Sequence, residues 1–302
     1  MLKMLYLGSN NFKELPNEIG ALDLESLFVQ ENSLEGLVPA GVFNMSNMTT
    51  LNLFGNRLNG RIPDNLCRNL PNLQGLNLAY YQFEGSLPSS LEQCKKLLVL
   101  ALGSNNFSGR TIPHEIGHHG NLETLSLGAN NLNGIIPSEI FNLSLLTGID
   151  LSLNQLTGSL PANIGLAIPH LQEIHVGGNN LSAEIPNFIS NSSKLTKLDM
   201  GPNLFSGFIP ATLCALPNLQ WLLLSLNNLM IDTSSPEANI FSCLPNLRNL
   251  RMLSLVGNPL STTLPASLGN LSTSIQYIDF RGCNFRGNIP SEIGNLSGLT
   301  TL

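Results

Sequence analysis

The stretch LETLSLGANNLNGIIPSEIFNLSL, residues 122–145, decides the fold. Leu125 and Leu127 lie two positions apart, which places both side chains on one face of a short strand, while Ser126 points to the opposite face. Asn130 follows this strand at the point where the chain turns inward. Its amide can satisfy backbone groups that no strand partner reaches. The first half of the stretch therefore predicts a strand closed by a buried asparagine.

The second half of the stretch predicts an irregular return. Leu132 leaves the strand and Ile136 brings apolar bulk back from the far side. Gly134 permits a tight turn, and Pro137 fixes an extended segment that needs no backbone donor. One such unit buries too little apolar surface to offset the entropy of ordering it, so neighbouring units must stack.

The same pattern recurs along the whole chain. The residue that closes each strand falls at positions 10, 32, 56, 81, 105, 130, 154, 179, 203, 227, 258 and 283, and all but positions 81 and 283 are asparagine. A period of 20–29 residues with L-x-x-L-x-L-x-x-N is the signature of a leucine-rich repeat. We therefore predict a single leucine-rich-repeat domain over residues 1–302, with twelve repeats and a thirteenth that begins at Leu299. It is an α/β solenoid with a parallel sheet on its concave side and irregular or 3-10 segments on its convex side.

Three repeats depart from the pattern. Tyr81 interrupts the asparagine row, and Cys283 replaces asparagine with another small residue that can be buried. The tenth repeat, residues 219–249, is longer than the others and lacks the Gly-x-Ile-Pro return. Within it Ser235 precedes a Pro-Glu pair, which predicts a short helix capped at its N-terminus. We interpret this insert as a variant return, with a dedicated contact site as the alternative.

Composition limits the partners. Only 11% of the residues are charged and the formal net charge is −6, which argues against nucleic acid or an anionic membrane, because both select for clusters of Lys and Arg. No apolar run approaches the ~20 residues of a membrane span. A repeat that begins directly after Met1 leaves no room for a signal peptide. Both ends lack polar caps, so we expect the chain to be part of a longer protein or a shortened gene product.

The cysteines do not suggest a framework of disulfides. They lie at positions 67, 94, 214, 243 and 283, an odd number scattered one per repeat. No pair has the spacing of a metal or redox site, so the sequence predicts free thiols.

Asn-x-Ser/Thr sequons favour passage through the secretory pathway. Eight are present, and these candidate glycosylation sites are Asn44, Asn47, Asn106, Asn142, Asn180, Asn191, Asn270 and Asn295.

The return segments carry a resemblance to a known family. They read GRIPDNL, GSLPSSL, GIIPSEI, GSLPANI, GFIPATL and GNIPSEI, and with the preceding N-x-L/F-x they resemble the plant-specific class of leucine-rich repeat over essentially the whole chain. The chain is most similar to ectodomains of plant receptor-like kinases, in the branch that includes immune receptors for bacterial proteins. The resemblance implies a right-handed superhelix, N-glycosylated and outside the plasma membrane. It also implies a peptide or protein ligand along the inner sheet and a co-receptor near the C-terminal repeats. The kinase and the membrane span of such receptors are absent from this sequence.

The segment HEIGH, residues 114–118, matches the H-E-x-x-H pattern of zinc proteases. That chemistry needs a regular helix that places the two histidines one turn apart. Here the segment follows Pro113 in a return and aligns with PSEIG at residues 290–294, so its Glu and Ile are repeat positions. We therefore predict no metal site and no cofactor.

A polar row is the second candidate for chemistry. Asp150, His175 and Asp199 occupy the central outward strand position in consecutive repeats, and Ser152 lies on the same face as Asp150. These residues superficially complete an acid–base–nucleophile set, but an open sheet supplies neither an oxyanion hole nor exclusion of water. We predict no enzymatic activity and interpret the row as solvated residues, with a pH-sensitive ligand contact as the alternative.

Aromatic residues on the concave face are candidates for contact with a partner. Tyr6, Phe28, Phe54 and Tyr80 are expected to form a patch over the first four repeats, and Trp221 and Tyr277 mark the C-terminal third. The alternative is that these rings shield neighbouring strands. The outward residues of the opening stretch are small, so recognition is expected at the aromatic flanks; they are Glu123, Thr124, Ser126, Gly128 and Ala129.

Three functions follow from these observations. The first is ligand recognition by the ectodomain of a plant receptor-like kinase or receptor-like protein. The second is a secreted inhibitor of a cell-wall hydrolase that resembles polygalacturonase-inhibiting proteins, although that family is nearer ten repeats and has cysteine caps. The third is a truncated product without activity. We expect the first, with peptide or protein as the partner and the extracellular side of the plasma membrane, or secretion, as the location.

Overall fold

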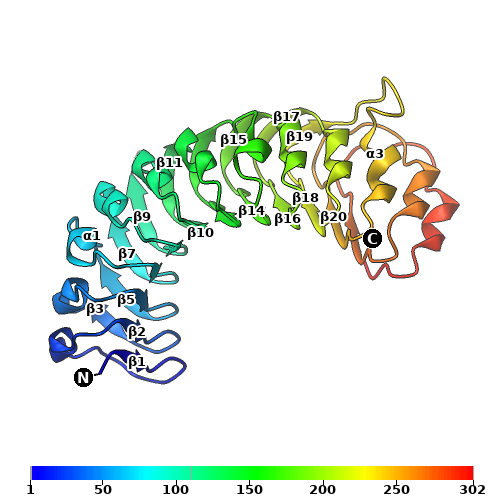
Figure 1. The fold of residues 1–302 in the computed structure, drawn as a ribbon. Helices are drawn as coiled ribbons and strands as arrows, with labels where there is room; N and C mark the ends of the chain where they lie inside the picture. Colours follow the sequence, from blue (N-terminus) through cyan, green and yellow to red (C-terminus); the bar gives the residue numbers. More distant parts are fainter. Residues whose placement is uncertain (1, 110, 302) are drawn as a thin grey trace. The chain divides into compact units, whose positions relative to one another are not determined.

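The computed structural model describes residues 2–109 and 111–301. It divides into two compact units, Met1–Gln155 and Leu156–Leu302. In each unit short parallel strands follow one another in sequence order, and helical returns lie on the side away from these strands (Figure 1). The predicted repeat solenoid is therefore confirmed in both units.

The first strand series has one three-residue strand in each repeat. In the first unit these strands are β1 (Met4–Tyr6), β2 (Ser26–Phe28), β4 (Thr50–Asn52), β6 (Gly75–Asn77), β8 (Val99–Ala101), β10 (Thr124–Ser126) and β12 (Gly148–Asp150). In the second unit they are β14 (Glu173–His175), β16 (Lys197–Asp199), β18 (Trp221–Leu223), β20 (Met252–Ser254) and β21 (Tyr277–Asp279). The central residue of each strand after β1 is buried, and its two neighbours point to the opposite face, as the leucine spacing predicts.

Asparagines close these strands and form the predicted buried row from Asn56 onwards, whereas Asn10 is exposed and Asn32 is half-buried. Asn130 Nδ2 donates hydrogen bonds to the carbonyl oxygens of Leu127, Leu102 and Gly128 at 3.0, 3.1 and 3.2 Å. Its Oδ1 accepts a hydrogen bond from the Phe107 backbone N–H at 3.0 Å. One side chain thus ties its own turn to the preceding repeat and satisfies backbone groups that the strand ladder leaves open.

Both predicted interruptions of the row are buried. The Tyr81 ring fills one gap, and its hydroxyl lies 3.5 Å from Asn56 Nδ2. Burial raises the pKa of Tyr81 far above its ordinary value. Cys283 fills the other gap, with its Sγ 3.1 Å from the Leu255 carbonyl oxygen.

A second strand series follows the asparagines, where the sequence predicted only turns. In the first unit it comprises β3 (Glu35–Leu37), β5 (Arg57–Gly60), β7 (Gln82–Gly85), β9 (Asn106–Gly109) and β11 (Asn131–Ile135). In the second unit it comprises β15 (Asn180–Glu184), β17 (Leu204–Phe208) and β19 (Asn228–Met230), and β13 (Gln155–Gly158) spans the sequence boundary. Gly134, assigned to a turn from the sequence, lies inside β11 with φ +81°. This φ lies in the left-handed region, which glycine adopts without the steric cost that a residue with a side chain would have.

The returns are mostly 3-10 helices, as predicted. Pro137 precedes one of them with φ −59° and ψ 133°, the extended conformation expected of it. The 3-10 helices are η1 (Asn17–Ala21), η2 (Ala40–Asn44), η3 (Ser89–Gln93), η4 (His114–His118), η5 (Ser138–Asn142), η6 (Asn187–Asn191), η7 (Ala211–Ala215), η8 (Leu244–Asn246), η9 (Ala266–Asn270) and η10 (Ser291–Asn295). Single α-helical turns replace them at α1 (Leu66–Asn69), α2 (Ile164–Ala167) and α3 (Ile240–Cys243). No helix in the described part of the chain is long and apolar enough to cross a membrane.

The insert of the tenth repeat does contain a helix, but its cap differs from the prediction. Asn239 is the N-cap of α3, and its side chain accepts a hydrogen bond from the Phe241 backbone N–H at 3.0 Å. Ser235 instead accepts a hydrogen bond from the Ala238 N–H at 3.2 Å. Ser235 therefore closes the turn before the helix.

The expectation of free thiols is wrong for four of the five cysteines. Cys67 is bonded to Cys94 in the first unit, and Cys214 is bonded to Cys243 in the second. Cys283 is the free and buried cysteine. The bonded residues are 27 and 29 positions apart, close to one repeat length, so stacking brings them together. This near-periodic separation was the signal in the sequence.

Candidate functional site

The candidate site is the outward face of the first strand series, called here the sheet face. Its side chains come from the first and third residue of each strand and from the short loop that leads to the closing asparagine. All nine predicted contact residues lie on this face or on that loop, and none of them belongs to the buried core.

The predicted aromatic patch consists of two ring pairs. Tyr6 and Phe28 are partners in the β1–β2 register, and their rings stack with centroids 4.8 Å apart. Phe54 and Tyr80 lie in the loops after β4 and β6, with an edge-to-face contact at 5.2 Å. The two tyrosines remain 62% and 60% exposed. The rings therefore both shield their neighbours and present apolar surface to solvent.

A hollow lies beside the second ring pair, and we call it the aromatic hollow. Its cavity volume is about 340 Å³. The lining residues are Phe54, Asn77, Ala79, Tyr80, Ala101, Gly103, Ser104, Ser126, Gly128, Ala129, Asp150, Ser152 and Leu153. The residues between its two ends are small, including those of the opening stretch that the sequence analysis set aside. Their small size creates the depression between the two ends.

Asp150 forms the far end of the aromatic hollow. Its Oδ1 accepts hydrogen bonds from the Ser152 backbone N–H at 3.0 Å and from the Ser152 hydroxyl at 2.6 Å. Its Oδ2 lies 3.5 Å from the Ser126 hydroxyl. Because Ser152 donates to a carboxylate, its hydroxyl is held in place and is not activated as a nucleophile would be by a neighbouring histidine.

The second unit carries a different group on the sheet face, called here the charged row. It consists of Glu173 and His175 on β14, Lys197 and Asp199 on β16, and Trp221 on β18. The register pairs His175 with Asp199, and His175 Nδ1 lies 3.9 Å from Asp199 Oδ2. Two members of the predicted polar row thus come together. Asp150, the third member, belongs to the first unit.

The charged row is held by internal partners. Lys197 Nζ lies 2.8 Å from Glu173 Oε1 and 4.6 Å from the ring centroid of Trp221. Burial alone would raise the pKa of Glu173, but the hydrogen bond and charge of Lys197, with a smaller contribution from His175, bring that pKa below its ordinary value. Trp221 therefore serves as a platform for Lys197.

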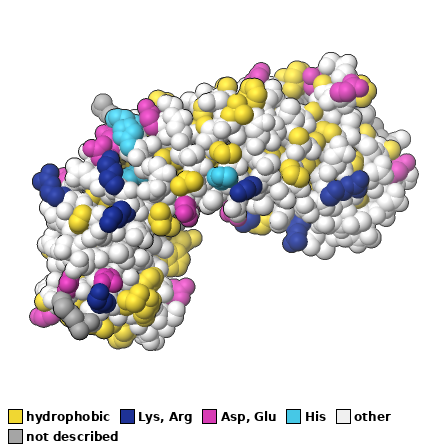
Figure 2. All heavy atoms as spheres, viewed as in Figure 1, with side chains coloured by type: hydrophobic (Ala, Val, Ile, Leu, Met, Phe, Trp, Pro, Cys, Tyr) yellow, Lys and Arg dark blue, Asp and Glu magenta, His cyan; other side chains and the backbone are white. Residues whose placement is uncertain are grey.

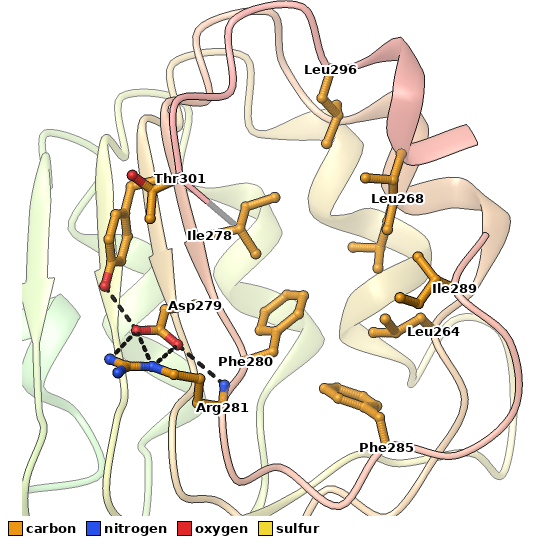
Figure 3. A pocket seen from close by; sticks show the side chains of 12 residues that line it. Leu264, Leu268, Ile278, Asp279, Phe280, Arg281, Phe285, Ile289, Leu296 and Thr301 are labelled. Atoms are coloured by element: carbon orange, nitrogen blue, oxygen red, sulfur yellow. Dashed lines mark hydrogen bonds and ion pairs between the residues drawn. The ribbon is translucent and has the colours of Figure 1, made fainter. Parts of the chain in front are cut away.

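Tyr277 is tied into a cluster at one edge of a cavity in the second unit (Figure 3). Its hydroxyl donates to Asp279 Oδ2 at 2.8 Å, and Arg281 Nε and Nη2 donate to the same carboxylate at 2.9 and 2.7 Å. The Arg281 hydrogen bonds hold the pKa of Asp279 at about 2. The same carboxylate raises the pKa of Tyr277. Sequence reasoning found Tyr277 but missed both of its partners.

The cavity itself is apolar and has a volume of about 590 Å³. Figure 3 shows the side chains of Leu264, Leu268, Phe280, Phe285 and Ile289 directed into it. Its lining comes from neighbouring repeats between Leu264 and Thr301, and we assign no ligand to it.

The HEIGH segment forms the 3-10 helix η4, not the regular α-helix that zinc protease chemistry requires. His114 Nδ1 lies 3.3 Å from Glu115 Oε2, and His118 Nδ1 lies 3.8 Å from Glu92 Oε2. Both histidines are exposed. Over residues 2–109 and 111–301, no group of three or more His, Cys, Asp or Glu is placed to hold a metal ion.

The next residue, His119, is a buried histidine that the sequence analysis overlooked. It occupies the position of Cys94 in the preceding repeat and of Leu143 in the following one, and it is only 1% exposed. Neither ring nitrogen has a hydrogen-bond partner among the described residues. Burial, with the charge of Lys95, lowers the pKa of His119, although the nearby carbonyls of Leu91 and Cys94 act in the opposite direction.

Replacing His119 by leucine is expected to raise the free energy of unfolding by about 1–2 kcal/mol at pH 7.5, because two unpaired buried nitrogens are removed. The folded state favours the neutral ring, so its stabilising contribution is complete above the unfolded pKa of ~6.5 and is lost as the pH falls below it. The advantage of His119→Leu should therefore grow towards pH 5.5. Urea unfolding at pH 7.5, 6.5 and 5.5 measures this, with the exposed His118→Gln as control. Parallel pH slopes for both variants and the parent chain would contradict it.

The eight sequon asparagines are all exposed. The Asn47 amide donates to the Asp23 carboxylate at 2.8 and 3.0 Å, and Asn44 Oδ1 accepts from Asn69 at 2.5 Å. Their glycosylation stays a prediction.

On the face visible in Figure 2, the Lys and Arg side chains lie in small separate groups.

Comparison with known proteins places this geometry in context. The chain matches the family described as Leucine-rich repeat region over residues 79–302, and Leucine Rich Repeat over residues 47–69. It is 37% identical over 75 residues to Receptor kinase-like protein Xa21 of Oryza sativa subsp. japonica, which is 25% of this chain and 7% of that protein. It is 39% identical over 88 residues to LRR receptor-like serine/threonine-protein kinase EFR of Arabidopsis thaliana, 29% of this chain and 8% of that protein. The matched stretches span less than a tenth of either relative.

Solved structures resemble the whole chain. The plant peptide hormone receptor RGFR1, in complex with RGF2, has a TM-score of 0.85 at 28% identity, over 99% of this chain and 50% of that one. The ectodomain of GASSHO1/SCHENGEN3 from Arabidopsis thaliana, in complex with CASPARIAN STRIP INTEGRITY FACTOR 2, has a TM-score of 0.83 at 33% identity, over 99% and 38%. The Arabidopsis receptor kinase HAESA, in complex with the peptide hormone IDA and the co-receptor SERK1, has a TM-score of 0.67 at 31% identity, over 99% and 56%. The chain thus spans about half the length of these structures, or less.

Proposed function

Because the chain belongs to the leucine-rich-repeat family, we propose that it is a recognition module of a plant receptor-like kinase or receptor-like protein. In this role it binds a peptide or protein on the sheet face and catalyses no reaction itself. Its biological setting is immune or developmental signalling. The receptor-kinase relatives match this chain in their repeats and not in a kinase domain. This supports ligand recognition as the role of the chain.

The single observation that carries this proposal is the exposed aromatic surface of the sheet face. The opposite side of the same strands already forms the core, so Tyr6 and Tyr80 have no core to fill. Large aromatic side chains on a regular, rigid surface contribute strongly to binding, because they bury much apolar area at a small cost in conformational entropy. The parallel strands hold these rings at fixed spacing, which suits an extended partner.

The solved relatives support the proposed partners and location. RGFR1, GASSHO1/SCHENGEN3 and HAESA were each solved with a peptide or protein factor, and HAESA also with the co-receptor SERK1. By analogy we expect a peptide ligand here, a co-receptor kinase near the C-terminal repeats, and a location on the extracellular side of the plasma membrane. The exposure of all eight sequons supports this location.

Selection of a displayed library of random 12-residue peptides on the purified chain tests this function. The selected peptides are expected to bind the chain and to lose at least tenfold in affinity with Tyr6→Ala or Tyr80→Ala, the size of effect typical of an aromatic anchor. Titration of labelled peptides by fluorescence anisotropy measures the affinities.

The control is Phe188→Ala, which removes a 52% exposed aromatic ring from η6, on the helical side of the repeats. This variant should bind the selected peptides like the parent chain. Failure to select any peptide, or peptides that depend on Phe188 and not on the sheet face, would contradict the proposed function.

A further inference from the structure

The aromatic hollow combines two kinds of binding group at opposite ends of a shallow floor. Phe54 and Tyr80 form an aromatic wall at one end, and the Asp150 carboxylate stands at the other. All of these residues lie in the first unit. The inference below rests on the proposed function and specifies which ligand chemistry this part of the sheet face selects.

The register of the strands explains the shape of the hollow. The third residue of successive strands pairs from Asn52 to Asn77, Ala101, Ser126 and Asp150. The row therefore drops from amide side chains to a methyl group and a hydroxymethyl group before it rises again at Asp150. The residues two positions after the end of each strand form a second row. Side-chain size falls along this row too, at Gly103 and Gly128.

The glycines keep the floor low because they have no side chain, and an added Cβ would come close to the next repeat. A Cβ added to Gly128 would lie 2.6 Å from Asp150 Oδ1, and a Cβ added to Gly103 would lie 3.1 Å from the Gly128 carbonyl oxygen. Close packing of the repeats thus fixes both the depth of the hollow and the position of the Asp150 carboxylate.

Exposed bulky residues frame the hollow in an unusual backbone conformation. Tyr80 and Leu153 both have positive φ, 64° and 51°, and both are more than half exposed. Most repeats have positive φ at this position, just before the closing residue, with glycine at Gly55 and Gly178, small residues at Ser104 and Ala129, and a second exposed leucine at Leu226. A large side chain in this conformation costs energy and gains little from burial here. Contact with a partner would bury these exposed side chains.

The charge of the hollow selects the chemistry of the partner. Asp150 is the one lining residue that carries a formal charge at neutral pH. Ser152 holds its Oδ1 through two hydrogen bonds, which orients the carboxylate and leaves acceptor capacity for a further donor, because a carboxylate has about four acceptor sites. Aromatic ring faces also attract cations. Both features favour a ligand with a positively charged side chain.

From this geometry we propose that the aromatic hollow binds an extended peptide segment with two anchors, an aromatic or apolar side chain on Phe54 and Tyr80 and a lysine or arginine at Asp150. Three strand steps separate β6, which precedes Tyr80, from β12, which ends at Asp150, or about 14 Å at ~4.8 Å per step. An extended chain covers this distance in about four residues at ~3.3 Å each. The two anchors are therefore about four residues apart in the ligand.

Two short peptides test the proposal on the purified chain, Ac-Phe-Ser-Gly-Ser-Arg-NH2 and its reverse order, Ac-Arg-Ser-Gly-Ser-Phe-NH2. In each, arginine is also replaced by citrulline, which has nearly the same shape without the charge. Saturation-transfer NMR titration gives the dissociation constants. In at least one order, the arginine peptide should bind at least fivefold more tightly than the citrulline peptide. Asp150→Asn should abolish this difference.

Two further variants test whether binding depends on the hollow itself and not on the net charge of the chain. Asp64→Asn removes an exposed carboxylate outside the hollow and should keep the preference for arginine. Ala101→Leu fills the floor at a half-buried strand position and should weaken both peptides. Equal binding of arginine and citrulline peptides in both orders, a preference that survives Asp150→Asn, or no binding of either peptide would overturn the proposal. The function proposed above would still stand if library-selected peptides depend on Tyr6 or Tyr80.

Discussion

Replacing Asn130 by alanine is expected to lower the free energy of unfolding by about 3–5 kcal/mol. The change removes three hydrogen bonds donated by Asn130 Nδ2 and the one accepted from the Phe107 N–H. Each buried backbone group left without a partner costs about 1–3 kcal/mol. Stacked repeats depend on their neighbours, so the loss extends to the interface with the preceding repeat.

Urea unfolding and amide hydrogen exchange measure this effect. The Phe107 amide should lose its protection in Asn130→Ala, because its acceptor is gone. Asn131→Ala is the matched control: it changes the same residue type one position later, where the side chain is exposed, and should alter stability by less than about 0.5 kcal/mol. Similar losses in the two variants would show that the buried amide is not the stabilising group.

Removing the first disulfide is expected to have an effect of similar size. The double variant Cys67→Ala, Cys94→Ala should lose about 3–4 kcal/mol, because a bond between residues 27 positions apart restricts the unfolded chain. The bond joins α1 to the residue after η3 and so fastens two neighbouring returns. Urea unfolding of the oxidised parent chain and of the double variant measures the difference.

Reduction provides the internal control for the disulfides. With dithiothreitol the parent chain should lose the contributions of both bonds, whereas the double variant should lose only that of Cys214–Cys243. Cys283→Ala should respond to reduction as the parent does, since Cys283 is not bonded. Alkylation of five thiols in the untreated, unfolded chain would contradict the assigned pairing.

The members of the candidate site could be predicted from the sequence, but their partners could not. Leucine spacing identified Tyr80 and Asp150 as outward residues. It did not show that Ser152 orients Asp150, or that Lys197 covers Trp221. Because Ser126 and Gly128 are small, the sequence predicted recognition at the aromatic flanks; in the structure these two residues line the floor of the aromatic hollow. Whether a side chain can contact a ligand depends on the size of the side chains beside it on neighbouring strands. Those neighbours come from other repeats, so the sequence of one repeat does not reveal them.

The sequence by itself determined the features that depend on short-range periodicity. The strand rhythm around Leu125 and Leu127, the buried amide of Asn130 and the extended return at Pro137 all recur within about 24 residues, and any repeat contains the physical reason for them. The stacking of the repeats followed, because one repeat cannot bury enough apolar surface alone.

The tertiary structure decided what depends on contacts between repeats. It paired the cysteines, formed a second strand series after the asparagines, joined Glu173 to Lys197, and set Phe54 and Tyr80 opposite Asp150 across a low floor. Each of these contacts joins residues from different repeats. Their distance depends on how far each repeat is offset against the next, and a difference of one or two residues in a return changes that offset. The stacked structure fixes the register, and the register fixes the site.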